Sequence, residues 1–223
     1  MKQGLPGTLN TLILFEDSYK FYDSLPNPVV PNPWLSDVMI PYEDLGAVFA
    51  QKTATLQQLA IPFMVQAEEI VQRCQPTWSW PRLESLALTS QLLQNDWGTR
   101  SDLENLLCRT SVLVQKMPKL QTLVLWNGGK GHACAFIYRV DGGSASITWR
   151  GTWKSSFSLR VVEAWQLTAS KLPRCPEVEV KQEDITGVIH SHGDAIYHLK
   201  LPCQVIDPAS LWQIRREAYS SAQ

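Results

Sequence analysis

A short apolar phrase occurs four times in this chain. Each copy has two leucines three positions apart and a further leucine or isoleucine two positions later, and the copies begin at Leu9, Leu56, Leu83 and Leu120. This spacing is typical of the strands of leucine-rich repeats, in which side chains alternate between two faces. The copies begin 47, 27 and 37 residues apart, so the repeat is irregular. A scaffold built from such repeats usually provides a binding surface.

The segments between the phrases determine how their strands can be connected. Apolar residues at helical spacing predict helices over 42–53, 63–74 and 102–116. Strands that alternate with helices are expected to run parallel and to be joined by right-handed crossovers. We therefore expect an α/β fold, an irregular leucine-rich-repeat-like right-handed solenoid over residues 1–131.

Three local features qualify this prediction. Five prolines within 24–41 exclude a helix or a central strand there and predict a surface insertion. Ser101 and Glu104 have the spacing of a capping box at the start of a helix. Asn127 follows the last leucine of the fourth phrase by two residues and is expected to hydrogen-bond to backbone groups, as the consensus asparagine of the repeat does.

The pattern changes after residue 131. Two alternating segments flank a Gly-Gly reversal and predict a hairpin. The remaining segments predict two more strands and two helices, the last opened by Asp207 as N-cap and Pro208 in the first turn. The expected elements are strands at 132–140, 144–150, 177–181 and 195–201, and helices at 159–172 and 207–218. We expect residues 132–223 to form an α+β cap continuous with the first region.

Composition excludes several classes of partner. A net charge of −1 and a sequence pI near 6.4 give no electrostatic basis for binding nucleic acid or an anionic membrane. Five cysteines, widely separated and without a CxxC pair, favour a reducing compartment, the cytosol or the nucleus. We expect a monomer without a cofactor.

One cluster resembles a metal site. His190, His192 and Asp194 alternate, with His198 four residues further on, and on a strand the first three side chains would share one face. That arrangement would suit a metal-dependent hydrolase, the alternative to a binding protein. Real sites usually have a closed ligand set, and the sequence supplies no accompanying cysteine pair or second carboxylate motif. A structural turn is therefore the preferred interpretation.

The segment from Ser146 to Trp153 is the most distinctive in the chain. Arg150 lies between Trp149 and Trp153 in sequence and could stack on either indole. The segment could form a partner-binding patch, or it could cover the open end of the solenoid, as repeat proteins require. The cap is slightly favoured.

Three stretches of the chain resemble a fungal family of domains that occur downstream of F-box motifs together with degenerate leucine-rich repeats. They are Pro118–Gly128, Ala135–Tyr138 and Ile147–Trp153. The resemblance implies the substrate-recognition region of an SCF-type ubiquitin ligase, with no catalytic residues. An F-box of about 40 to 50 residues cannot be read before Leu9, so the chain is expected to be a fragment or to lack the link to the adaptor.

The sequence thus favours a non-enzymatic protein-interaction scaffold over an enzyme or a remnant without function. The partner would be an unknown protein or a ubiquitination substrate. It would contact exposed residues between the leucines (Asn10, Gln57, Gln58, Glu84, Ser85, Gln121, Thr122). Aromatic and cationic residues typical of interface hot spots would add to that contact (Trp126, Trp149, Arg150, Trp153).

Overall fold

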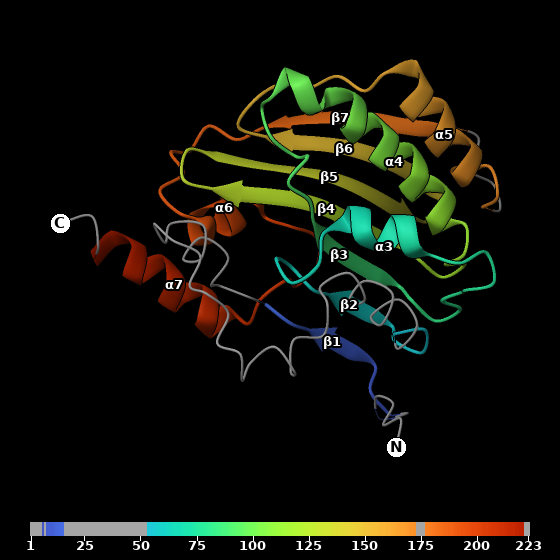
Figure 1. Cartoon of the computed structure of the whole chain (residues 1–223), viewed down its shortest axis with the longest axis horizontal. Helices are drawn as coiled ribbons and strands as arrows, with labels where there is room; N and C mark the ends of the chain where they lie inside the picture. The colour runs from blue at the N-terminus through green and yellow to red at the C-terminus, as the bar shows by residue number, and fades with distance from the viewer. Residues whose placement is uncertain (1–5, 7, 16–52, 173–176, 221–223) are drawn as a thin grey trace, which may run out of the picture.

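A single seven-stranded sheet organises the part of the chain that the structure, a computed structural model, describes: residues 6, 8–15, 53–172 and 177–220. The strands lie in the order of the sequence (Figure 1). β1–β4 are mutually parallel, β5 is antiparallel to both of its neighbours, and β7 is parallel to β6. The strands are β1 (Thr11–Ile13), β2 (Gln58–Ala60), β3 (Ser85–Thr89), β4 (Thr122–Gly129), β5 (His132–Asp141), β6 (Ser144–Gly151) and β7 (Val178–Asp184).

The four leucine phrases lie side by side, as the sequence predicts. Their middle leucines, Leu12, Leu59, Leu86 and Leu123, are direct neighbours across the four parallel strands. All four belong to the larger apolar core of the molecule, in which the last three are fully buried and Leu12 is partly buried. The repeated phrase therefore marks one continuous apolar row of the sheet.

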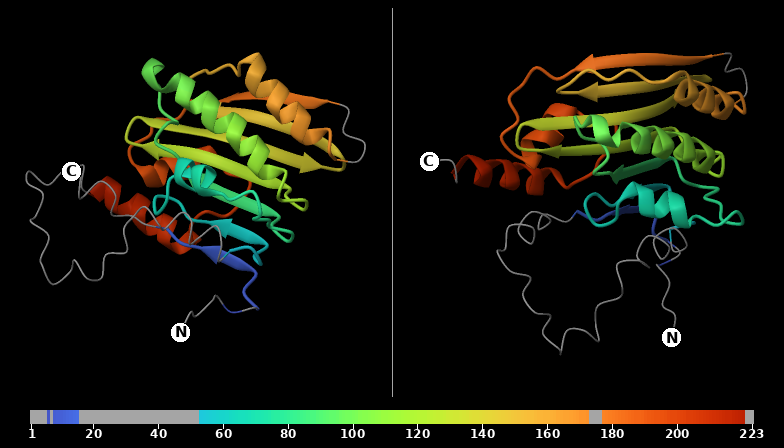
Figure 2. Two further views of the ribbon diagram at one scale, coloured as in Figure 1. Left: turned by 45° about the vertical axis from the view of Figure 1, so that its right-hand side comes forward. Right: turned by 45° about the horizontal axis from the view of Figure 1, so that its top comes forward.

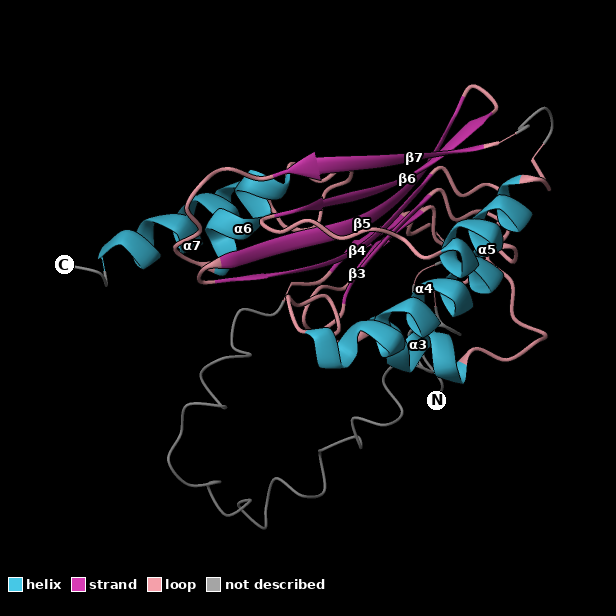
Figure 3. Ribbon diagram, turned by 90° about the horizontal axis from the view of Figure 1, so that it is seen from above, coloured by secondary structure: helices cyan, strands magenta, loops and turns pink. Residues whose placement is uncertain are grey.

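Three helices cover this face of the sheet: α3 (Ala67–Arg73), α4 (Arg100–Val114) and α5 (Leu159–Ala169). Figure 3 shows them together on one side. Their apolar side chains, such as Ile70, Leu106 and Trp165, complete the larger core. These helices confirm three of the predicted helical segments, with ends that differ by a few residues.

Two helices lie on the opposite face, α6 (His192–Leu199) and α7 (Pro208–Ser220). α6 packs on β4 and β5, where Ala195 and Leu199 join a second apolar core with Val124, Trp126 and Ile137. α7 packs against α6 and extends away from the sheet toward the C-terminus (Figure 2). Asp207 caps α7 as predicted, because its Oδ1 accepts hydrogen bonds from the backbone N–H groups of residues 209 and 210.

The predicted strand at 195–201 is wrong, because this segment forms most of α6. Ser191 Oγ accepts a hydrogen bond from Asp194 N–H and caps the helix. Ala195, Ile196 and Leu199 are buried at helical spacing, so packing on the sheet overrides the strand propensity of the local residues.

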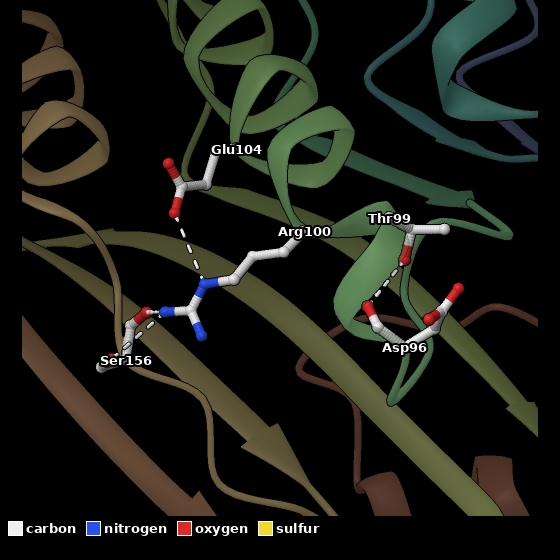
Figure 4. A network of polar contacts seen from close by, with 5 residues as sticks. All are labelled: Asp96, Thr99, Arg100, Glu104 and Ser156. Carbon is white, nitrogen blue, oxygen red and sulfur yellow. Dashed lines mark hydrogen bonds and ion pairs between the residues drawn. The ribbon is translucent and has the colours of Figure 1, made fainter.

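The predicted capping box at the start of α4 is also wrong. The helix begins at Arg100, so Ser101 lies inside its first turn. Glu104 instead pairs with Arg100, with 3.7 Å between Oε1 and Nε (Figure 4). Arg100 also donates to the backbone oxygen of Ser156, which ties this end of α4 to the segment between β6 and α5.

Other expectations concern the organisation of the chain. β4 and β5 pair along their length, so the boundary proposed at residue 131 falls inside a hairpin of one open mixed α/β sheet. Asn127 hydrogen-bonds as predicted, since its Nδ2 donates to the backbone oxygen of Leu93 at 3.2 Å. The predicted insertion at 24–41 and nearly all of the predicted helix at 42–53 lie outside the described residues.

A glycine allows α6 to approach the sheet closely. A Cβ atom at Gly128 on β4 would lie 2.3 Å from Cβ of Ala195. We expect Gly128→Ala to lower the free energy of unfolding by about 1–3 kcal/mol, because neither backbone can move without repacking the second core. Chemical denaturation measures this loss. Gly98→Ala, where the nearest atom would lie 3.5 Å away, is the control and should change stability little. Equal stability of the two variants would contradict the close packing of α6 on β4.

Candidate functional site

A row of seven polar residues crosses the whole sheet. Strand pairing makes each residue the direct neighbour of the next, and every strand contributes one. The row consists of Thr11, Gln58, Ser85, Thr122, Arg139, Ser146 and Glu179, and we call it the polar row. Side chains alternate along a strand, so these residues share the face of the sheet on which α6 lies.

The polar row stays accessible, whereas the next row on the same face is covered. Four of its residues (Thr11, Gln58, Arg139, Glu179) are exposed and the other three are half-buried. Two positions further along β2, β3 and β4, Ala60, Ala87 and Val124 are buried in the second core, whereas Lys181 at the same level of β7 is exposed. The boundary between covered and open sheet therefore runs beside the polar row.

The open area widens over β5, β6 and β7. A hollow of about 360 Å³ lies there, bordered by Arg139, Thr148, Arg150 and Lys181 among others, with Pro202 on its rim. The charges are mixed and largely paired. Lys181 Nζ lies 2.8 Å from Glu179 Oε2, and Arg150 Nε lies 2.5 Å from Glu183 Oε2. A surface with paired charges of both signs is suited to polar contacts with a protein rather than to a polyanion.

The structure brings the predicted contact residues between the leucines together. Four of them form a second line at the start of the parallel strands: Asn10, Gln57, Glu84 and Gln121. The backbone oxygen of each accepts a hydrogen bond from a backbone N–H of the next strand. Gln58, Ser85 and Thr122 belong to the polar row itself. All seven are at least partly accessible.

Two predicted binding residues are core residues instead. Trp126 is fully buried in the second core, and Trp149 is 1% exposed in the larger core. Neither can contact a partner in this structure. Trp153 is half-buried, packs edge-on against Trp149, and accepts a hydrogen bond from Trp149 Nε1 through its backbone oxygen.

Arg150 has a different role from the predicted stacking on tryptophan. It follows Trp149 on β6, so its side chain points to the opposite face of the sheet. Its Nη1 donates to the backbone oxygens of Leu199 and Lys200, at 2.6 and 2.7 Å. The guanidinium therefore satisfies carbonyl groups at the end of α6 and fixes that helix to β6 and β7.

Sequence reasoning missed Arg139, Ser146 and Glu179, which extend the polar row beyond the fourth phrase. Alternation along the hairpin at 132–150 places Arg139 and Ser146 on one face, and alternation along 177–181 does the same for Glu179, but only the registers of β4 with β5, β5 with β6 and β6 with β7 align the three with Thr122. It also missed that Pro81–Leu86 and Pro118–Leu123 match position by position, which places Arg82 and Lys119 at equivalent sites before β3 and β4.

The geometry assumed for the metal site is wrong. Asp194 lies in the first turn of α6, is fully buried, and binds Arg215 Nε through Oδ1 at 3.1 Å. Its other oxygen accepts from the backbone N–H of His190 at 3.2 Å. Among the described residues no group of three or more His, Cys, Asp or Glu side chains could hold a metal. Asp194 thus anchors α7 to α6 through Arg215.

The cysteines of the described region are poor nucleophiles. Burial raises the pKa of Cys74, Cys108 and Cys203, and it raises that of the fully buried Cys134 well above its usual range. Thiols with raised pKa values stay protonated at neutral pH and react slowly. Cys175 lies outside the described residues.

A second hollow of about 360 Å³ lies between α3 and α4 and is bordered by Glu68, Asp102, Asn105 and Arg109, with apolar residues beneath. Ser90 Oγ donates to one carboxylate oxygen of Glu68. The other oxygen is buried without a hydrogen bond to the described residues. Burial is the main cause that raises the pKa of Glu68.

The raised pKa of Glu68 makes stability depend on pH. The folded state binds this proton more tightly than the unfolded chain does, so the favourable contribution is complete below the unfolded pKa, near 4.5, and is lost as pH rises through the folded pKa. We expect Glu68→Gln to become more stable relative to wild type as pH rises from 4.5 to 7, measured by urea denaturation. Glu163→Gln, on the exposed side of α5, is the control for charge loss. A constant or reversed difference for Glu68→Gln would contradict the burial argument.

Comparison with known proteins places the chain in a family. A family of unknown function (DUF6546) matches residues 4–207, most of the chain. The chain belongs to this family. No curated protein and no solved structure matches it. The match ends just before α7, and it includes all seven strands and the whole polar row. The helices of the described region include none with the length and apolar character to cross a membrane.

Proposed function

We propose that this chain is a protein-interaction scaffold and that the polar row, with the open sheet over β5–β7, is its recognition surface. The observation that carries the proposal is the row itself: seven polar side chains in register across the sheet, beside a row that is apolar and covered on β2–β5. Sites built on paired strands hold their side chains more precisely than loops do. Mixed charges and amide groups on such a surface favour a polar protein partner.

The repeat-like half of the sheet supports a narrower form of the proposal. Parallel strands in chain order, with α3 and α4 on one face, support a leucine-rich-repeat-like scaffold, a class whose open strand face binds partners. From the resemblance to F-box-associated domains we propose that the partner is a ubiquitination substrate of an SCF-type ligase. The two proteins would interact in the cytosol or the nucleus. No residue of the open face is assigned a catalytic role.

A comparison of two matched variants tests the surface. The first carries Thr11→Arg, Gln58→Arg and Arg139→Glu, all at exposed positions of the polar row. The second carries Val112→Arg, Leu167→Arg and Arg109→Glu, with the same change of charge at exposed positions of α4 and α5. We expect the second variant to capture the same proteins from the native host as the wild type does. The first variant should capture at least about tenfold less of them. Equal retention by both would reject the polar row as the recognition surface.

A further inference from the structure

Among the described residues, no strand pairs with the outer edge of β7. Its seven residues pair with β6 at every position, and its sequence contains no proline or glycine. Glu179, Val180, Lys181 and Gln182 are all exposed. β7 forms the upper edge of the sheet in Figure 1 and faces the reader in Figure 3. Proteins commonly shorten, bend or cover such an edge, because it can pair with another strand.

The direction of the backbone groups on this edge follows from two hydrogen bonds. Ile185 N–H donates to the backbone oxygen of Gly151 on β6, so the odd-numbered residues of β7 face β6. Val178 N–H faces outward and is occupied by Gln166 Oε1 at 2.8 Å. The N–H and C=O groups of Val180, Gln182 and Asp184 therefore point outward and can pair with a strand.

The charges along β7 select one way for two copies of this edge to pair. We propose that two copies of the chain associate through antiparallel β7 edges about a two-fold axis at Gln182. Lys181 then lies opposite Glu183 of the second copy, twice, and Val180 lies opposite Asp184. Cross-strand pairs of opposite charge stabilise a sheet, and like charges opposite each other destabilise it.

Neighbouring registers are disfavoured by the same rule. A two-fold axis at Lys181 or at Glu183 would place that residue opposite the same residue of the second copy. An axis at Asp184 would place two aspartates opposite each other. An axis at Val180 places Lys181 opposite Glu179 but also Glu183 opposite Glu177, so its charges cancel, and it requires Val178 N–H, which Gln166 already occupies. The register with its axis at Gln182 is therefore the one that the charges and the free backbone groups of β7 favour.

The dimer would join two open sheet faces. Lys181 and Glu183 point to the face that carries the hollow over β5–β7, so the hollows of the two copies would be neighbours. A contact through one strand edge is small, so the monomer dominates in dilute solution and the dimer forms at about 10–100 µM. The dimer does not depend on the proposed function, because a monomer can also present the polar row.

Sedimentation equilibrium of the full chain up to about 200 µM tests the proposal. We expect wild type to dimerise, and Lys181→Glu and Glu183→Lys each to weaken the dimer at least about tenfold, because each opposes like charges twice. A mixture of these two single variants should dimerise again, because every facing pair then has opposite charges. Recovery on mixing distinguishes the register from a loss of folding.

A backbone variant gives a second test that does not use charge. Val180→Pro removes an outward N–H without removing a bond to β6, and proline is tolerated at such edge positions. We expect it to remain folded, by circular dichroism, and to be monomeric. A wild type that stays monomeric at 200 µM, or variants that dimerise as wild type does, would overturn the proposal.

Discussion

Replacing Trp165 with alanine is expected to lower the free energy of unfolding by about 4 kcal/mol. The side chain is fully buried where α5 meets the sheet, and its ring centroid lies 5.0 Å from that of Phe136 and 4.7 Å from that of Tyr138. Removing the indole opens a cavity between α5 and the sheet. The cavity stays open because neither element can move to fill it without disrupting the rest of the core. Chemical denaturation followed by circular dichroism measures the loss.

Trp165→Phe is the matched control for this prediction. It keeps an aromatic ring beside β5 and removes an indole N–H that is buried without a hydrogen bond to the described residues. We expect it to cost at most about 1.5 kcal/mol. Similar losses for the alanine and phenylalanine variants would show that the aromatic packing of α5 is not what stabilises this layer.

Asp194→Ala is expected to destabilise the protein by about 3 kcal/mol and to release α7. Its carboxylate is fully buried and bonds both Arg215 and the backbone before α6, so its removal leaves a partly buried guanidinium without its ion pair. Arg215 also lies 3.7 Å from the centroid of the Tyr197 ring, so the ion pair is one of two contacts of this side chain with α6, and its loss weakens the attachment of α7. Denaturation measures the first effect, and protease cleavage within 208–220 measures the second.

A double-mutant cycle separates the ion pair from general damage to α6. The double variant Asp194→Ala/Arg215→Ala should lose less unfolding free energy than the sum of the two single variants. The reason is that Arg215→Ala also removes the positive charge whose carboxylate partner Asp194→Ala has taken away. Arg216→Ala, one residue further on and exposed, should have little effect. Additive losses for Asp194 and Arg215 would mean that the two do not anchor α7 together.

Much of the sheet could be predicted because local pattern and tertiary environment agree in it. The middle leucine of each phrase faces the same core, and the alternation over 132–150 marks a hairpin whose two faces are both largely buried. α4 and α5 follow their apolar periodicity within a few residues. These elements depend mainly on short-range spacing.

The errors arose where a distant contact decides the structure. The segment at 195–201 has strand-forming residues, but burial against β4 and a cap from Ser191 make it helical. The cluster at 190–194 is predicted to be a turn, yet Gly193 lies inside α6, where a Cβ atom would meet Arg215 and Ile214 of α7 at 3.0 Å. The role of Asp194 in holding α7 could not be predicted from the sequence, because it depends on the position of Arg215 in the folded chain.

The candidate surface was only partly foreseeable for the same reason. Gln58, Ser85 and Thr122 occupy equivalent positions of their phrases, so the sequence alone aligns them. Arg139, Ser146 and Glu179 join them only through the pairing of β5, β6 and β7. The tryptophans were misassigned because residue type suggests an interface, whereas strand alternation places Trp126 and Trp149 in opposite cores.

Site-specific photocrosslinking in the native host tests the recognition surface most directly. A photoreactive residue would replace Gln58 in the polar row or Val112 on the opposite side of the molecule, both of which are exposed. The proposal predicts a discrete protein adduct from position 58 that is absent from position 112. Adducts of equal yield from both positions, or an adduct from position 112 alone, would contradict the assignment of the polar row as the binding surface.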